Sequence, residues 1–196
     1  MSGSDEIDLA VVGSGGAAMS AAITARRAGR RVVLVERSIL GGTCVNVGCV
    51  PSKTLLAAAQ ARHAALTNPF AGAPTSADTV DLGALVAQKD ELVGRLRGAK
   101  YADVAAAYGF EIRPGQATFL DERTLAVDGQ PLPARAYLVA TGSRPAAPDL
   151  PGLARVDWLT STTAMELHSC PSPWWSSVAA TSGWSRLSCS RTWGRR

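Results

Sequence analysis

A glycine-rich turn between two short apolar runs constrains the fold of this chain more than any other feature. The runs at 7–12 and 31–36 are typical of buried parallel strands. Between them, Gly13, Gly15 and Ala18 form a Gly-x-Gly-x-x-Ala pattern, which opens a helix predicted over 19–28. A strand, a tight turn, a helix and a second strand make a β-α-β unit, so the sequence predicts an α/β fold.

Each position of that pattern suits a bound dinucleotide. The first glycine permits the tight turn, the second lets the backbone approach a pyrophosphate, and the small third residue lets helix and strand pack closely. The helix N-terminus adds N–H donors and a favourable dipole. Glu36 ends the second strand, where a carboxylate can accept a hydrogen bond from a ribose hydroxyl. Glycine-rich turns are common, but this context favours a Rossmann-like domain, without separating FAD from NAD.

The downstream pattern predicts more helix and several short strands. We expect a helix from about 52 to 66, a loop over 67–79, and a largely helical stretch over 81–108 with a break near Gly94 or Gly98. Three short antiparallel strands are predicted at 110–113, 116–120 and 124–127, with a turn at 128–129, followed by a buried strand at 136–140. The result is a parallel sheet with a small antiparallel insert.

Two cysteines five positions apart, Cys44 and Cys49, precede the helix predicted from about residue 52. A thiol near a helix N-terminus has a lowered pKa and is a better nucleophile. Two such thiols can interconvert between dithiol and disulfide. A pair of buried structural cysteines and half of a zinc site are the other interpretations. Zinc needs four ligands, and His63 and His168 lack zinc-finger-like spacing, so the sequence favours a redox-active pair.

One segment of the chain closely resembles the active-site segment of the FAD-dependent pyridine nucleotide-disulfide oxidoreductases. It reads Gly41-Gly-Thr-Cys44-Val-Asn-Val-Gly-Cys49-Val-Pro-Ser-Lys53. Within that family, 14–19 and the two valines at 45 and 50 are more similar to the mercuric reductase branch than to lipoamide dehydrogenases. The resemblance covers about residues 5–167. It implies that 1–167 is the N-terminal portion of a FAD-binding domain with ββα layers.

The resemblance implies roles for individual residues. Cys49 is the flavin-proximal thiolate in charge-transfer contact with the isoalloxazine, and Cys44 is the thiol that exchanges with substrate. Lys53 lies near flavin N5, with a solvated helix lysine as the alternative interpretation, and an ordinary strand end is the alternative at 141–142. Ala117 meets the adenine end through its backbone. The residues expected to contact FAD are Gly13, Gly15, Ala17, Ala18, Glu36, Arg37, Ser38, Gly42, Thr43, Lys53, Ala117, Thr141 and Gly142.

The same resemblance implies an electron relay. NADPH reduces FAD, FAD reduces the Cys44–Cys49 disulfide, and the dithiol binds Hg(II), which leaves as Hg(0). Soft thiolates suit a soft metal ion. A disulfide substrate, as in lipoamide-dehydrogenase-like reductases, is the alternative. Members of the family are homodimers. We expect a cytoplasmic protein with no membrane partner, because the N-terminus is polar and no run of about 18 apolar residues exists.

The composition changes near residue 168. The chain has 20 Lys and Arg against 16 Asp and Glu, a net charge of +4. From 168 onward there are four arginines and no acid, so 1–167 is neutral and the basic excess is no argument for a nucleic-acid partner. The same stretch holds four of the five tryptophans. Two different compositions are therefore joined in one chain.

Frame-shifted translation is our expectation for 168–196. If the gene is read one base earlier over 173–185, the codons that these residues allow can encode a strand followed by a second glycine fingerprint. Members of the family begin their NADPH domain at this position with such a strand and fingerprint. We therefore expect an out-of-frame tail, no NADPH or dimerisation domain in this chain, and an inactive, flavin-depleted product. A genuine basic, Trp-rich segment that binds a membrane surface or a partner is the alternative.

Overall fold

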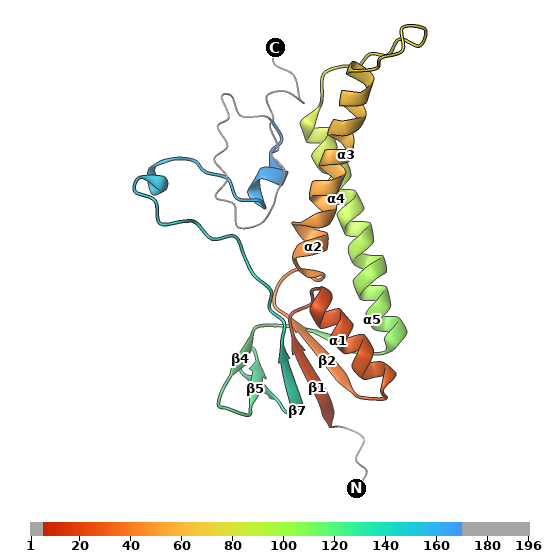
Figure 1. The fold of residues 1–196 in the computed structure, drawn as a ribbon. Coiled ribbons are helices and arrows are strands. Elements are labelled where there is room, and N and C mark those ends of the chain that lie inside the picture. Colours follow the sequence, from red (N-terminus) through yellow and green to blue (C-terminus); the bar gives the residue numbers. More distant parts are fainter. Residues whose placement is uncertain (1–5, 170–196) are drawn as a thin grey trace.

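A four-stranded parallel sheet lies at the centre of the fold. The computed structural model describes residues 6–169, and the sheet has the order β3–β2–β1–β7 (Figure 1). Its strands are β1 (Ile7–Val12), β2 (Val32–Glu36), β3 (Glu111–Pro114) and β7 (Ala134–Val139). β1 and β2 lie where the apolar runs predict them, and their central side chains are buried. The predicted α/β class with a parallel sheet is confirmed.

Helices connect the strands and form a long hairpin beyond the sheet. α3 and α4 rise together above the sheet edge in Figure 1. A π-helical turn at Gly98 replaces the predicted break, so the chain continues from α4 into α5 without interruption. The helices are α1 (Gly16–Arg27), α2 (Gly42–Asn46), α3 (Cys49–Leu66), α4 (Leu82–Arg97), the π turn η1 (Gly98–Ala102), α5 (Asp103–Tyr108), and the 3-10 turns η2 (Leu153–Arg155) and η3 (Thr163–Glu166).

A small antiparallel sheet is inserted between β3 and β7. It consists of β4 (Ala117–Phe119), β5 (Leu125–Val127) and β6 (Gln130–Leu132). The turn between β5 and β6 is the predicted one, and both Asp128 and Gly129 have positive φ, as a two-residue hairpin requires. β6 itself was not predicted. The insert therefore has three strands, and their antiparallel pairing confirms the predicted antiparallel insert.

Two sequence expectations about strands were wrong. The segment at 110–113 was expected to be antiparallel, but β3 pairs in parallel with β2, with Leu34 opposite Ile112. The helices α3 to α5 provide the long crossover that a parallel pair needs. The strand expected to be buried at 136–140 is β7, an edge strand of the described sheet, and Val139 at its end is 60% exposed.

The sheet is covered on both faces, which gives the three layers implied by the sequence. On one face, Val11 and Leu34 pack against Met19 of α1 and Ala105 of α5. On the other face, β1 and β2 pack against the antiparallel insert, whose Leu125, Val127 and Leu132 are buried. Successive side chains of a strand point to opposite faces of the sheet. Because β1 and β2 are apolar at nearly every position, both faces present apolar side chains for packing.

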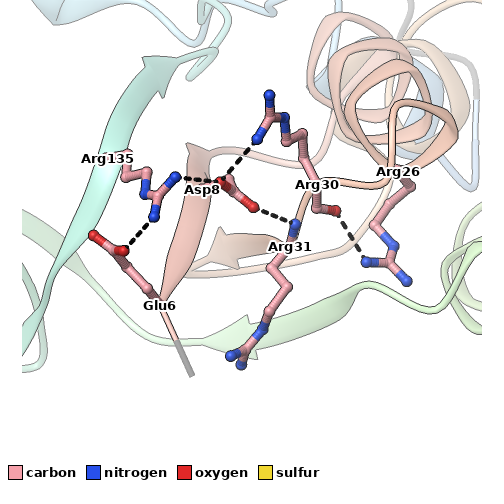
Figure 2. Close-up of polar contacts among 6 residues, drawn as sticks. All are labelled: Glu6, Asp8, Arg26, Arg30, Arg31 and Arg135. Carbon is pink, nitrogen blue, oxygen red and sulfur yellow. Dashed lines mark hydrogen bonds and ion pairs between the residues drawn. The ribbon is translucent and has the colours of Figure 1, made fainter. Parts of the chain in front are cut away.

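A network of charged groups joins the amino-terminal ends of the strands (Figure 2). Arg135 of β7 binds Glu6 at 2.6 Å and Asp8 at 3.6 Å, and Arg30 binds Asp8 at 3.7 Å. Asp8 also accepts a hydrogen bond from the backbone N–H of Arg31. The hydrogen bond and charge of Arg135 lower the pKa of Glu6. These groups are largely exposed, so each pair stabilises the fold only modestly.

One lysine is fully buried, in α4. The side chain of Lys89 is 1% exposed, and its Nζ lies 2.7 Å from Glu166 and 2.8 Å from Asp90. It also donates to the carbonyl of Met165. Burial lowers the pKa of Lys89, but the hydrogen bonds to the two carboxylates outweigh it, and the net shift is upward. This group attaches η3 to α4.

One expectation falls almost wholly outside the described part of the chain. The out-of-frame tail expected at 168–196 lies outside it except for 168 and 169. For residues 6–169, every helix is too short or too polar to span a bilayer.

Candidate functional site: a nucleotide fingerprint and a dithiol loop

The carboxyl ends of three parallel strands meet at the glycine fingerprint. Gly13 follows β1 with φ +108°, and its N–H donates to Val35 of β2. A Cβ at Gly13 would lie 2.3 Å from the carbonyl oxygen of Ala140, at the end of β7. Thr141 also borders that position, and Gly142 beyond it has φ +68°. Glycine is therefore needed because the backbone that follows β7 passes close to the turn, as well as for the turn itself.

The N-terminus of α1 is open to a ligand. Gly15 is its N-cap, no side chain caps the first turn, and no acidic residue lies in that turn. Gly16 and Ala17 are exposed, and a Cβ at Gly16 would meet nothing within 4 Å. Ala18 is fully buried against the sheet, the packing role predicted for a small residue there. Uncapped N–H groups of this kind suit a pyrophosphate.

Ser14, inside the fingerprint, is a connecting residue that the sequence did not single out. It is 1% exposed, and its hydroxyl donates to Glu36 Oε2 at 2.5 Å while accepting from the N–H of Gly41 at 2.9 Å. Ser38 donates through its N–H and its hydroxyl to Glu36 Oε1. Because a carboxylate oxygen has about two acceptor sites, Oε2 keeps one for a ribose hydroxyl.

The predicted adenine-side residues lie beside the end of β2. The N–H of Gly115 donates to the carbonyl of Glu36, and Arg37 donates to Gln116 at 3.4 Å. Ala117 follows as the first residue of β4, half-buried against the sheet. The structure therefore gathers the residues assigned to the ribose and the adenine at one strand end. Their contact with a nucleotide stays a prediction.

The cysteine loop touches the fingerprint backbone to backbone. Gly42 has φ +65°, and a Cβ there would lie 2.6 Å from the Cα of Gly15. The side chain of Thr43 is exposed. Within the loop, a Cβ at Gly48 would lie 2.8 Å from the carbonyl oxygen of Thr43. Three glycines therefore allow the loop to fold tightly against itself and against α1. The dithiol and the nucleotide fingerprint share one site.

Both thiols of that loop are free and exposed. Cys44 lies in the short helix α2, and Cys49 is the first residue of the 18-residue helix α3. A hydrogen bond with Cys49 raises the pKa of the Cys44 thiol, with burial and the charge of Cys49 adding to the effect. The sequence expected a lowered pKa from a helix N-terminus; for Cys44 this was wrong, because its neighbour is a second ionisable thiol.

The π turn η1 brings two further groups to the thiols. Burial raises the pKa of the Tyr101 hydroxyl, and the nearby charges of Cys44 and Cys49 raise it further. Lys100 acts in the opposite direction on Cys44, lowering the pKa of that thiol. Both residues lie more than fifty positions from the cysteines, and no local pattern pointed to them. π turns interrupt α-helices frequently at functional sites.

Lys53, assigned by resemblance to the flavin, lies in the first turns of α3. Its side chain is exposed and has no hydrogen-bond or ion-pair partner among residues 6–169. The structure is thus compatible with both interpretations, the flavin contact and the solvated lysine. Among the same residues, no cluster of three or more His, Cys, Asp or Glu side chains is arranged to hold a metal ion.

These features define a nucleotide-binding α/β domain that carries an accessible dithiol. The family model for pyridine nucleotide-disulphide oxidoreductases matches residues 7–179. The chain therefore belongs to the pyridine nucleotide-disulphide oxidoreductase family, whose members use FAD.

Curated relatives and solved structures agree with that assignment. The chain is 55% identical over 170 residues to a mercuric reductase of Streptomyces lividans, covering 84% of this chain and 36% of that protein. It is 49% identical over 166 residues to a mercuric reductase of Staphylococcus aureus, covering 85% and 30%. The HOCl-induced flavoprotein disulfide reductase RclA of Escherichia coli matches with a TM-score of 0.67 and 29% identity, covering 83% and 34%. The chain spans about a third of the length of each.

Proposed function

We propose that this chain supplies the FAD-binding and dithiol part of a mercury(II) reductase, with NADPH as the electron donor of the complete reaction. The observation that carries the proposal is the shared site: two exposed thiols on a loop whose Gly42 touches Gly15 of the nucleotide fingerprint. The mercuric reductases at 42–55% identity support Hg(II) as the substrate. We further propose that the complete protein acts as a homodimer in the cytoplasm.

The residues present fit FAD. The uncapped N-terminus of α1 can bind the pyrophosphate, and the free acceptor site on Glu36 Oε2 can bind the ribose. Thr141 borders the fingerprint and Gly142 follows it in the chain, while Thr43 and Lys53 lie on the cysteine-loop side. When bound, FAD supplies the electron pair that reduces the disulfide. The chain's own residues bind the nucleotide and hold the two reacting sulfurs on one loop beside the fingerprint.

The thiol chemistry can be written with balanced electrons. Two electrons and two protons convert the Cys44–Cys49 disulfide into two thiols. Loss of both protons gives two thiolates, which bind Hg(II) through two S–Hg bonds. When the two sulfurs give an electron pair to the metal, the S–Hg bonds break, an S–S bond forms, and Hg(0) leaves. Cys49 and burial raise the pKa of the Cys44 thiol, and the charge of Lys100 offsets part of that rise in favour of the thiolate, which is the form that binds the metal.

A disulfide substrate is the second candidate, favoured by the likeness to a flavoprotein disulfide reductase. In that reaction the Cys44 thiolate attacks one sulfur of the substrate and forms a mixed disulfide. Cys49 then attacks Cys44, which releases the second substrate thiol and leaves the Cys44–Cys49 disulfide. Both reactions use the same pair, so the metal ion and the disulfide must be compared directly.

The test titrates reduced protein with HgCl₂ and counts the thiols left for Ellman's reagent. The chain also contains Cys170 and Cys189, so both are replaced by serine in every sample. One equivalent of Hg(II) should protect both remaining thiols in the presence of a monothiol competitor, since two sulfurs chelate the ion. Cys44→Ser should lose that protection. FAD binding is measured on the same samples by flavin fluorescence.

Three results would count against the proposal. Protection that is equal in the parent and in Cys44→Ser would show that the thiols act singly. Absence of FAD binding at millimolar flavin would refute the proposed FAD site. Rapid oxidation of the dithiol by a small disulfide, with no competitive binding of Hg(II), would favour the disulfide reductase.

A further inference from the structure

The cysteine loop is held by an asparagine that a distant arginine orients. Asn46 lies between the two cysteines at the end of α2, and its Nδ2 donates to the carbonyls of Leu40 and Gly42, both at 2.9 Å. Its Oδ1 accepts from Nε of Arg97, the last residue of α4, at 2.9 Å. Both amide protons and the amide oxygen of Asn46 are therefore engaged.

This arrangement fixes which way the amide faces. If Asn46 turned over, its oxygen would face two carbonyls and its NH₂ group would face the guanidinium, so all three contacts would become repulsive. Arg97 is a donor only, so it selects the productive orientation. Both side chains are half-buried, where such hydrogen bonds are less exposed to competition from water.

The two carbonyls bound by Asn46 flank the most constrained turn of the loop. Gly41 and Gly42 have φ of +108° and +65°. Cys44 lies two residues after Gly42, so a change in the backbone conformation of this turn moves the sulfur of Cys44 directly. Gly41 also faces Tyr101 of η1, since a Cβ there would lie 3.3 Å from the ring. The α4–η1 segment therefore borders this turn at Tyr101 and is linked to it through Arg97 and Asn46.

We propose that Arg97 is a positioning residue for the dithiol: it acts through Asn46 on the turn at 40–42 and so maintains the spacing of Cys44 and Cys49. The inference rests on the proposed redox function of that pair. Arg97 works through geometry: the cation whose charge offsets part of the raised pKa of the Cys44 thiol is Lys100. The removal of Arg97 should therefore change the disulfide equilibrium through the spacing of the two sulfurs.

The experiment measures the equilibrium between dithiol and disulfide against a glutathione buffer, in the chain that lacks Cys170 and Cys189. Arg97→Met should lower the equilibrium constant for disulfide formation about tenfold, which raises the reduction potential by about 30 mV for this two-electron couple. Arg95→Met is the matched control. Arg95 lies on the same helix, is 62% exposed and pairs with Glu91, so its removal should change the constant less than about twofold.

A second variant separates Arg97's orienting role from a general loss of contacts. Asn46→Ala removes the amide through which Arg97 acts, and it should lower the constant at least as much as Arg97→Met. The double variant should then show no further fall, because both changes break one connection.

The outcomes separate this inference from the proposed function. A parent chain that forms no Cys44–Cys49 disulfide overturns both. A parent that forms it, with equal constants for the Arg97→Met and Arg95→Met variants, overturns the role of Arg97 alone. Additive effects of Arg97→Met and Asn46→Ala would do the same. If circular dichroism shows Arg97→Met to be unfolded, Arg97→Lys replaces it: a full retention of the parent constant would then refute the need for the guanidinium.

Discussion

Gly13→Ala is the substitution whose cost follows most directly from the structure. The new Cβ would lie 2.3 Å from the carbonyl oxygen of Ala140 and 2.9 Å from its carbon, against about 3.4 Å for ordinary contact. Both atoms are backbone, so no side-chain rotation relieves the overlap. A φ of +108° adds strain of order 1–3 kcal/mol for a residue with a Cβ. Moving β7 away adds about 1–3 kcal/mol, as overpacking does elsewhere.

The expected loss is about 4 kcal/mol in the free energy of unfolding, or about 8–16 °C in Tm for a chain of this length. Urea unfolding followed by circular dichroism measures the free energy, and a thermal scan measures Tm. Gly94→Ala is the matched control. It lies inside α4 with nothing within 4 Å of its Cβ, so alanine should stabilise the chain by about 0.5–1 kcal/mol. Equal midpoints for Gly13→Ala and the parent would refute the close approach of β7.

Three further substitutions test the site and its support. In Cys49→Ser, the iodoacetamide alkylation of Cys44 should reach its half-maximal rate at a lower pH, because the neighbour that raises the pKa of the Cys44 thiol is gone; an unchanged midpoint would contradict this. Glu166→Gln should cost about 1–2 kcal/mol in urea unfolding, since buried Lys89 keeps one of its carboxylates; no change would mean that η3 is not attached there. Ser14→Ala should cost about 1–3 kcal/mol and weaken FAD binding, and a neutral result would rule out its bridging role.

The elements around the fingerprint could be predicted because their signals are local. An apolar run, two glycines and a second apolar run determine β1, α1 and β2 within a few residues. β3 was misassigned because its direction depends on a partner about eighty residues earlier in the chain. β6 was missed because Gln130-Pro131-Leu132 has no apolar pattern. A proline is tolerated there because β6 is an edge strand of its sheet.

The residues of the candidate site were predicted or missed for the same reason. The cysteines and the fingerprint glycines were found because their chemistry is contained in short motifs. Ser14 and Arg97 were not, because their partners lie 22 to 51 positions away and only the fold brings them together. The pKa of Cys44 was predicted in the wrong direction for a related reason. A helix N-terminus can be predicted from sequence, whereas the distance between two ionisable thiols depends on the loop.

The nucleotide half and the thiol half of this site are connected at two places. Gly15 meets Gly42 without side chains between them, and Ser14 bonds both Glu36 and the N–H of Gly41. The turn at 41–42 is tied in addition through Asn46 to α4. Any shift of the fingerprint is therefore transmitted to the loop within a few bonds of Cys44. Because these links are backbone contacts and buried hydrogen bonds, the two halves cannot be optimised separately, and a substitution at either should change both FAD binding and thiol reactivity.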